Sequence, residues 1–141
     1  MLPDQSISRS MVLESLPSVV PGVCKEILLE LQTRDYTQDD IFAIHLALEE
    51  AVANAIKHGN KSDPDKKVKI DCTIDSKKVE IFITDQGNGF DPQQIPDPRA
   101  GENIYKADGR GLFLIRAYMD VAEFNQCGNS LHMVKYNNCK G

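Results

Sequence analysis

The chain has 141 residues, of which 41% are hydrophobic and 26% are charged, and its formal net charge is −5. This length fits one domain over residues 1–141, and the composition excludes a disordered protein. The acidic balance excludes direct nucleic-acid binding, and the lack of a long apolar run or a signal-peptide pattern leads us to expect a cytoplasmic protein with no membrane partner.

The first half of the chain predicts a strand followed by two helices. Residues 7–13 are expected to form a short strand, and Pro21 leads into a first helix with one apolar face. Thr37 is the expected N-cap of the second helix, because its hydroxyl can accept a hydrogen bond from a free backbone N–H. His58 and Gly59 are expected to form the last turn and the C-cap of this helix.

The second half predicts two hairpins separated by a long loop and a third helix. The alternating apolar residues indicate four strands, and the loop is long enough to be functional rather than a simple connection. Helices gathered on one face of such a sheet predict an α+β fold, a two-layer sandwich with a mixed, mostly antiparallel sheet. The expected elements are strands 68–74, 79–83, 121–126 and 131–136, a loop over residues 91–108 and a helix that begins at Gly109.

Glu50, Asn54 and His58 follow one another at four-residue spacing on the second helix and therefore share one stripe. The neighbouring alanines leave a shallow groove beside this stripe. Asn54 offers an oxygen ligand for a hydrated magnesium ion, and Glu50 can accept a proton from a hydroxyl. A polar, solvent-facing side of the helix explains the same spacing.

Asp85-Gln86-Gly87-Asn88-Gly89 follows an apolar strand. Glycines let the backbone approach a flat ligand closely, and a buried Asp85 carboxylate needs a hydrogen-bond donor, which an adenine amino group would supply. A turn that simply ends the strand would use the same residue types.

Gly109-Arg110-Gly111 stands where the long loop enters a helix. Free N–H groups and the helix dipole favour phosphate at such a place, although a flexible hinge also uses glycines. An Asn-bearing helix, an Asp-x-Gly-x-Gly strand end and a Gly-x-Gly helix start, in this order, point together to one nucleotide site.

These segments resemble a known superfamily. The stretch from Glu49 to Gly59 resembles the N box of the GHKL, or Bergerat-fold, ATPases, Asp85 to Phe90 resembles their G1 box, and Gly109 to Ile115 resembles their G2 box. Within that superfamily the short chain and the His-Gly ending resemble the anti-sigma-factor serine kinases. The resemblance covers nearly the whole chain.

The resemblance implies a role for each site residue. Glu50 is implied as the general base, Asn54 as the magnesium ligand and Asp85 as the residue that binds the adenine amino group. A loop over residues 91–108 is implied to close over the phosphates. The implied ATP-binding set is Asn54, Asp85, Gly87, Gly89, Gly109, Arg110, Gly111, Asn129 and Ser130.

Two positions depart from the family pattern. A threonine usually follows the glycine of the last hairpin and supports the adenine-binding aspartate, but this chain has Asn129 there and Ser130 next. Some members place an arginine before the second glycine box, where this chain has Ala107; Lys106 and Arg110 are the nearest basic residues. These departures bear on adenine affinity and on phosphotransfer.

The resemblance implies an ATP- and magnesium-dependent serine/threonine protein kinase that acts as an anti-sigma factor in a partner switch. Its implied partners are a sigma factor and a small antagonist protein that receives the phosphate on a serine. Two other functions are open: an ATP-gated binding module without catalysis, and the isolated catalytic domain of a histidine kinase. Many family members are homodimers, and residues 7–13 are a candidate edge strand for such pairing.

Overall fold

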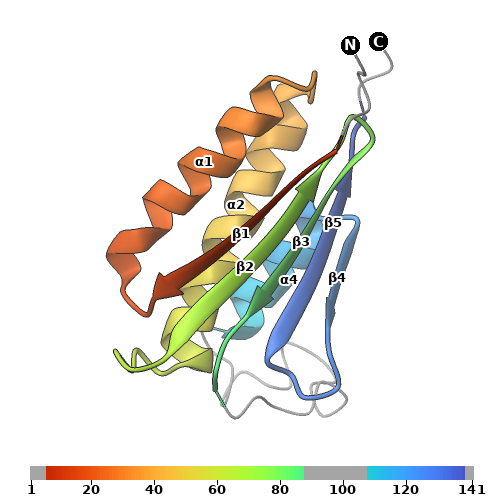
Figure 1. The fold of residues 1–141 in the computed structure, drawn as a ribbon. Coiled ribbons are helices and arrows are strands. Elements are labelled where there is room, and N and C mark those ends of the chain that lie inside the picture. Colours follow the sequence, from red (N-terminus) through yellow and green to blue (C-terminus); the bar gives the residue numbers. More distant parts are fainter. Residues whose placement is uncertain (1–5, 88–107, 139–141) are drawn as a thin grey trace.

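The computed structural model describes residues 6–87 and 108–138, with side chains from residue 111 onward in the second stretch. A five-stranded sheet in the order β1-β2-β3-β5-β4 carries the helices on one face (Figure 1). In these two stretches no helix is long and apolar enough to cross a bilayer. The elements are β1 (Ile7–Glu14), a 3-10 turn η1 (Pro17–Val19), α1 (Val20–Gln32), α2 (Gln38–Asn54), a π-helical turn η2 (Ala55–Gly59), β2 (Lys67–Ile74), β3 (Lys78–Thr84), α4 (Asp108–Tyr118), β4 (Val121–Phe124) and β5 (Ser130–Tyr136).

The pairing of the strands confirms the expected α+β sandwich. Both expected hairpins form, β2 with β3 and β4 with β5. All four ladders between the described strands are antiparallel, so the sheet is not mixed as expected but antiparallel throughout. β1 lies at one edge of the sheet, as expected for residues 7–13, and β4 lies at the other edge. β4 ends at Phe124 and not at residue 126, because Asn125 already belongs to the turn: its Oδ1 accepts a hydrogen bond from Asn129 N at 3.0 Å.

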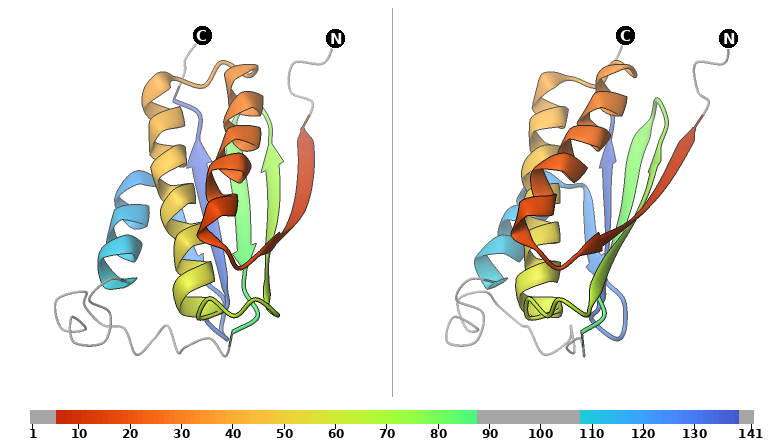
Figure 2. Two further views of the ribbon diagram at one scale, coloured as in Figure 1. Left: turned by 90° about the vertical axis from the view of Figure 1, so that its left-hand side faces the viewer. Right: turned by 60° about the vertical axis from the view of Figure 1, so that its left-hand side comes forward.

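The helices form a single layer in which α2 lies between α1 and α4 (Figure 2). Side chains at every second position of the strands point into this layer. Ile70 of β2, Ile81 of β3 and Met133 of β5 are all fully buried there, and burying side chains of this size contributes about 1.5–3 kcal/mol each. The core therefore fixes α2 on the middle of the sheet, and with it the polar residues near the end of that helix.

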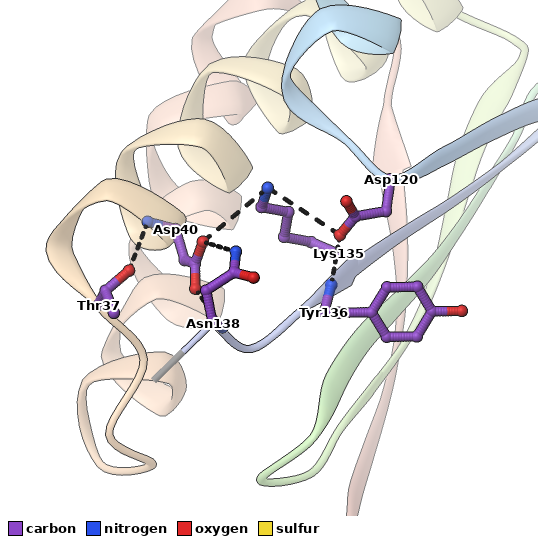
Figure 3. Close-up of polar contacts among 6 residues, drawn as sticks. All are labelled: Thr37, Asp40, Asp120, Lys135, Tyr136 and Asn138. Carbon is purple, nitrogen blue, oxygen red and sulfur yellow. Dashed lines mark hydrogen bonds and ion pairs between the residues drawn. The ribbon is translucent and has the colours of Figure 1, made fainter. Parts of the chain in front are cut away.

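The start of α2 is held by an aspartate (Figure 3). Thr37 is the N-cap, as expected, because its Oγ1 accepts a hydrogen bond from Asp40 N at 3.0 Å. The buried Asp40 carboxylate accepts two hydrogen bonds from Asn138, from N to Oδ2 and from Nδ2 to Oδ1, both at 2.9 Å. Lys135 Nζ lies 3.9 Å from Asp40 Oδ1 and 4.0 Å from Asp120 Oδ2. This cluster ties α2 to the end of β5.

The end of α2 differs from the expectation. The last turn, η2, is π-helical and its C-cap is Asn60, whose N donates to Ala55 O at 2.8 Å. Gly59 is therefore not the C-cap, and it does not adopt a positive φ. The wider π-turn also departs from the regular helical repeat on which the stripe of Glu50, Asn54 and His58 was based, and His58 within it is exposed.

Candidate nucleotide site

Gly111 of α4 lies directly against two polar side chains of α2. A Cβ at position 111 would lie 2.8 Å from Asn54 Nδ2 and 3.0 Å from Glu50 Oε2. The buried Gly111 thus brings the predicted glycine-rich helix start into contact with the predicted Glu50/Asn54 stripe. Only a glycine leaves the ends of these two side chains where they are, and the contact brings two of the three nucleotide segments together.

The third segment packs against the end of the same helix. A Cβ on Gly59 would overlap the Asp85 carboxylate, and a Cβ on Gly87 would overlap the carbonyl oxygen of Gly59. Both glycines are required by this close approach of two backbones. The Asp85 carboxylate accepts a hydrogen bond from Gly87 N at 2.8 Å to Oδ1. The Asp85–Gly87 turn is therefore seated on η2, one helical turn beyond Asn54.

The Asp85 carboxyl is in an environment that disfavours its charge. Burial raises the pKa of Asp85 above its ordinary value, while the Gly87 N–H and the positive charge of Lys66 act in the opposite direction. Within the described part of the chain, Asp85 Oδ2 accepts no hydrogen bond. A half-buried carboxylate with spare acceptor capacity is suited to bind an N–H donor of a ligand.

The last hairpin supports Asp85 through the backbone. Asp85 N donates to Asn129 O at 2.9 Å. The side chain of Asn129 is engaged within its own turn, where Oδ1 accepts from Asn125 Nδ2 at 2.8 Å. Ser130 Oγ lies 2.9 Å from Thr84 Oγ1, on the side of the sheet that the helices leave uncovered. Asn129 and Ser130 are thus beside Asp85 in the sheet, but the hydrogen bonds of their side chains go to Asn125 and Thr84 and not to the Asp85 carboxylate.

The remaining predicted residues fall at the margin of the described structure. Gly109 and Arg110 belong to the first turn of α4. Gly89 lies outside the described residues, as do Lys106, Ala107 and the predicted loop up to residue 107.

The oxygen atoms of Glu50 and Asn54 fit a magnesium ion that is shared with phosphates. Magnesium in nucleotide sites takes one or two protein ligands and completes its coordination with phosphate and water. Among the side chains that the structure describes, those of residues 6–87 and 111–138, no group of three or more His, Cys, Asp or Glu could hold a metal. Asn54 Oδ1 would be the protein ligand, with Glu50 beside it.

Sequence reasoning missed one residue that organises the site. Asn60 is only 1% exposed; its Oδ1 accepts a hydrogen bond from Gln86 N at 2.8 Å, and its Nδ2 donates to Ser15 Oγ at 2.9 Å. A polar residue next to a helix end is usually interpreted as solvated, and no pattern in the sequence indicates these long-range contacts. A better signal was the Gly-Asn pair itself, because asparagine is favoured where side chains bond to a turn.

Comparison with known proteins agrees with this geometry. Residues 13–135 match the family described as the histidine kinase-like ATPase domain. A serine-protein kinase RsbW of Staphylococcus aureus (strain MSSA476) is 36% identical over 108 residues, which cover 71% of this chain and 68% of that protein. An anti-sigma F factor of Oceanobacillus iheyensis is 33% identical over 110 residues, which cover 72% of this chain and 73% of that protein.

A serine-protein kinase RsbW of Listeria monocytogenes (strain HCC23) is 32% identical over 112 residues, covering 74% of this chain and 71% of that protein. The solved RsbU and RsbW domains of a Mycobacterium tuberculosis protein share the fold, with a TM-score of 0.63 and 16% identity over 93% of this chain, which spans 32% of that longer chain. The chain belongs to the histidine kinase-like ATPase domain family, among the anti-sigma-factor serine kinases.

Proposed function

We propose that this chain is a magnesium- and ATP-dependent serine/threonine protein kinase that acts as an anti-sigma factor. In this proposal it binds a sigma factor and phosphorylates a serine on a small antagonist protein, which switches partners as a result. The relatives named serine-protein kinase and anti-sigma factor support the kinase and the regulatory halves of this proposal.

The contact of Gly111 with Glu50 and Asn54 is the observation on which the proposal rests. It places the start of α4, with its free backbone N–H groups, beside a carboxylate and a carboxamide of α2. Backbone N–H groups at a helix start bind phosphate, and a carboxylate next to them is positioned to act on a hydroxyl that approaches the γ-phosphate.

The proposed chemistry divides among the residues as follows. The Asp85 carboxylate accepts a hydrogen bond from the adenine amino group, and Asn54 holds magnesium, which neutralises charge on the phosphates when it is bound. The serine hydroxyl of the protein substrate gives its proton to Glu50 while its oxygen bonds to the γ-phosphorus. The bond between the γ-phosphorus and the bridging oxygen breaks, and ADP leaves.

A binding module that uses ATP without phosphotransfer is the second candidate. The hairpin residue that usually supports the adenine-binding aspartate is Asn129 in this chain, and its side chain is hydrogen-bonded to Asn125. Asp85 then receives support from a carbonyl oxygen alone at that position. In this second function ATP would favour partner capture, and no phosphoprotein would form.

Transfer of labelled phosphate separates the candidates. The purified chain is incubated with γ-labelled ATP and an extract of the cells from which it comes, and labelled proteins are tested for acid stability. We expect one acid-stable phosphoserine protein, formed by wild type and by Glu49→Gln but not by Glu50→Gln, although Glu50→Gln still binds ATP. Glu49 is a matched control because it is an exposed carboxylate on the same helix turn.

Each other outcome of this experiment has a definite meaning. ATP binding with no labelled protein would support the binding module. An acid-labile label would indicate phosphohistidine and would support the catalytic domain of a histidine kinase. Full activity of Glu50→Gln would show that another group accepts the serine proton.

A further inference from the structure

Asn60 lies at the junction of four segments that are distant in the sequence. Its Nδ2 donates to Ser15 Oγ at 2.9 Å and to Lys67 O at 3.0 Å, and its Oδ1 accepts from Gln86 N at 2.8 Å. Ser15 follows β1, Lys67 begins β2 and Gln86 follows β3, while Asn60 itself caps the π-turn after α2. The Asn60 side chain thus connects the end of η2, which follows α2, with the Asp85–Gly87 turn.

The orientation of the Asn60 amide is fixed by the chemistry of its partners. Lys67 O can only accept a hydrogen bond and Gln86 N can only donate one, so the carboxamide nitrogen must face the first and the oxygen the second. Ser15 Oγ donates its own proton to Lys66 O at 2.6 Å and is therefore left as an acceptor for Asn60. Both N–H groups of the amide are satisfied in a site that is only 1% exposed.

The Asn60 amide also closes a ring of hydrogen bonds with the turn. Gln86 bonds to Asn60 through its backbone N, and its side-chain Oε1 accepts from Lys67 N at 2.6 Å. Lys67 O in turn accepts from Asn60 Nδ2. The residue between Asp85 and Gly87 is therefore held from two sides, and neither bond involves the Asp85 carboxylate.

The π-turn is what brings Asn60 to this position. In a regular α-helix, residue 60 would follow Phe42 by about five whole turns and would share its outward direction, and Phe42 is 58% exposed. The additional residue in the π-turn, closed by the bond from Asn60 N to Ala55 O, rotates the helix end by about 100°. Asn60 consequently points inward, toward the strand ends.

We infer that Asn60 is a positioning residue for the nucleotide base. It holds Gln86 N, and through that turn it sets the place of the Asp85 carboxylate relative to η2, so that adenine is selected over bases without an amino group at the corresponding position. The inference rests on the proposed ATP site and adds to it a residue that does not contact the nucleotide.

The test compares ATP and GTP affinities, measured by calorimetry with magnesium on the full chain. For Asn60→Ala we expect the dissociation constant for ATP to rise about tenfold and the preference for ATP over GTP to fall. Ser15→Ala is the matched control, because it removes two bonds of the same network on the β1 side, from Asn60 Nδ2 and to Lys66 O, and leaves Gln86 N bonded to Asn60. Its melting temperature should fall while its preference for ATP stays that of wild type.

A second pair of variants tests the same bond without touching the buried residue. Gln86→Pro removes the N–H that Asn60 accepts, since proline has none, and Gln86→Ala removes only the side chain of this exposed residue. Gln86→Ala still removes the bond from Lys67 N to the Gln86 side chain, so we expect it to lower the preference for ATP over GTP only in part. We expect Gln86→Pro to lower the preference further, because only the proline variant also removes the bond to Asn60.

Two results would overturn the inference. One is a preference for ATP within about twofold of wild type in both Asn60→Ala and Gln86→Pro. The other is an equal loss of preference in Ser15→Ala, which would mean that general loosening of the network is responsible. A wild-type chain that binds no ATP would instead refute the proposed function, and this inference with it.

Discussion

Gly111 and Asn54 are in contact across the α2–α4 boundary, and the space for a side chain at position 111 is taken up by the Asn54 amide, 2.8 Å from where a Cβ would be. α2 and α4 are thus in contact at the place where we propose that the ATP phosphates and magnesium bind. The two residues are 57 positions apart in the sequence, and the proposed phosphotransfer depends on their contact.

Gly111→Ala should leave the fold intact and reduce phosphotransfer. Alanine favours a helix by about 1 kcal/mol relative to glycine, and the atoms it would meet, Asn54 Nδ2 and Glu50 Oε2, are the ends of side chains that can rotate. The rotation misplaces the groups that we assign to the metal and to the base, so we expect the rate of phosphotransfer at saturating ATP to fall about tenfold or more.

The control for this variant is Gly22→Ala. Gly22 lies in the first turn of α1, and a Cβ there meets nothing within 4 Å. It should match wild type in rate. Equal rates for Gly111→Ala and Gly22→Ala would contradict the packing at the α2–α4 boundary. A urea titration in which Gly111→Ala is already unfolded without urea would contradict it as well.

Asp85→Asn should remove a destabilising effect at neutral pH, namely the cost of burying the charged Asp85 carboxylate. Burial raises the pKa of Asp85 above its ordinary value of 3.8, so the folded chain keeps this proton to a higher pH than the unfolded chain. As pH rises from 3.8 through the folded pKa, the unfolded state loses the proton first, and stability falls. Asparagine cannot ionise and keeps an oxygen for Gly87 N.

Urea titrations between pH 4 and pH 7 would measure this effect. We expect Asp85→Asn to be at least as stable as wild type at pH 7 and to lose less stability than wild type as the pH rises. Asp65→Asn, at an exposed carboxylate of the loop before β2, is the control and should follow wild type. A clear loss of stability in Asp85→Asn at pH 7 would show that the carboxylate is favoured by the fold.

Asp40→Ala should destabilise the chain without altering the nucleotide site. The buried Asp40 carboxylate accepts two hydrogen bonds from the exposed residue Asn138, and losing a hydrogen bond to a charged group costs about 1.5–3 kcal/mol. Asp39→Ala is a close control, because Asp39 lies in the same first turn of α2 but is exposed. It should lose only the helix-dipole contribution, about 0.3–1 kcal/mol.

Chemical denaturation and ATP calorimetry on both variants would check this expectation. The cluster lies at the start of α2 (Figure 3), more than two helical turns from Glu50. An equal loss of stability in Asp39→Ala and Asp40→Ala would mean that the Asn138 bonds contribute little.

Local patterns in the sequence predict most of the helices and strands of this fold. Thr37 caps α2 as its residue type predicts, and the alternation in residues 68–74 and 79–83 predicts the hairpin that the structure contains. These features depend on neighbours in the chain, and therefore a sequence pattern encodes them directly. The order of the three motifs predicts in addition that the segments around Glu50, Asp85 and Gly111 belong to one site, and the family resemblance implies the same.

The end of α2 could not be predicted in the same way. The apolar repeat of a helix does not indicate a π-turn, and the sequence therefore predicts Gly59 as the C-cap. In the structure, Gly59 instead makes room for the Asp85 carboxylate, because it has no side chain. The contacts of Asn60 with Ser15 and Gln86 span 45 and 26 positions in the chain. Such contacts arise only when the strands have been placed beside the helix.

The most direct test of the account is ATP binding by calorimetry, with and without magnesium, on wild type and Asp85→Asn. The account predicts that wild type binds ATP in a magnesium-dependent way and that Asp85→Asn, although folded, binds at least about tenfold more weakly. A wild type that binds no ATP, or an Asp85→Asn variant that binds as tightly as wild type, would contradict the assignment of these residues to a nucleotide site.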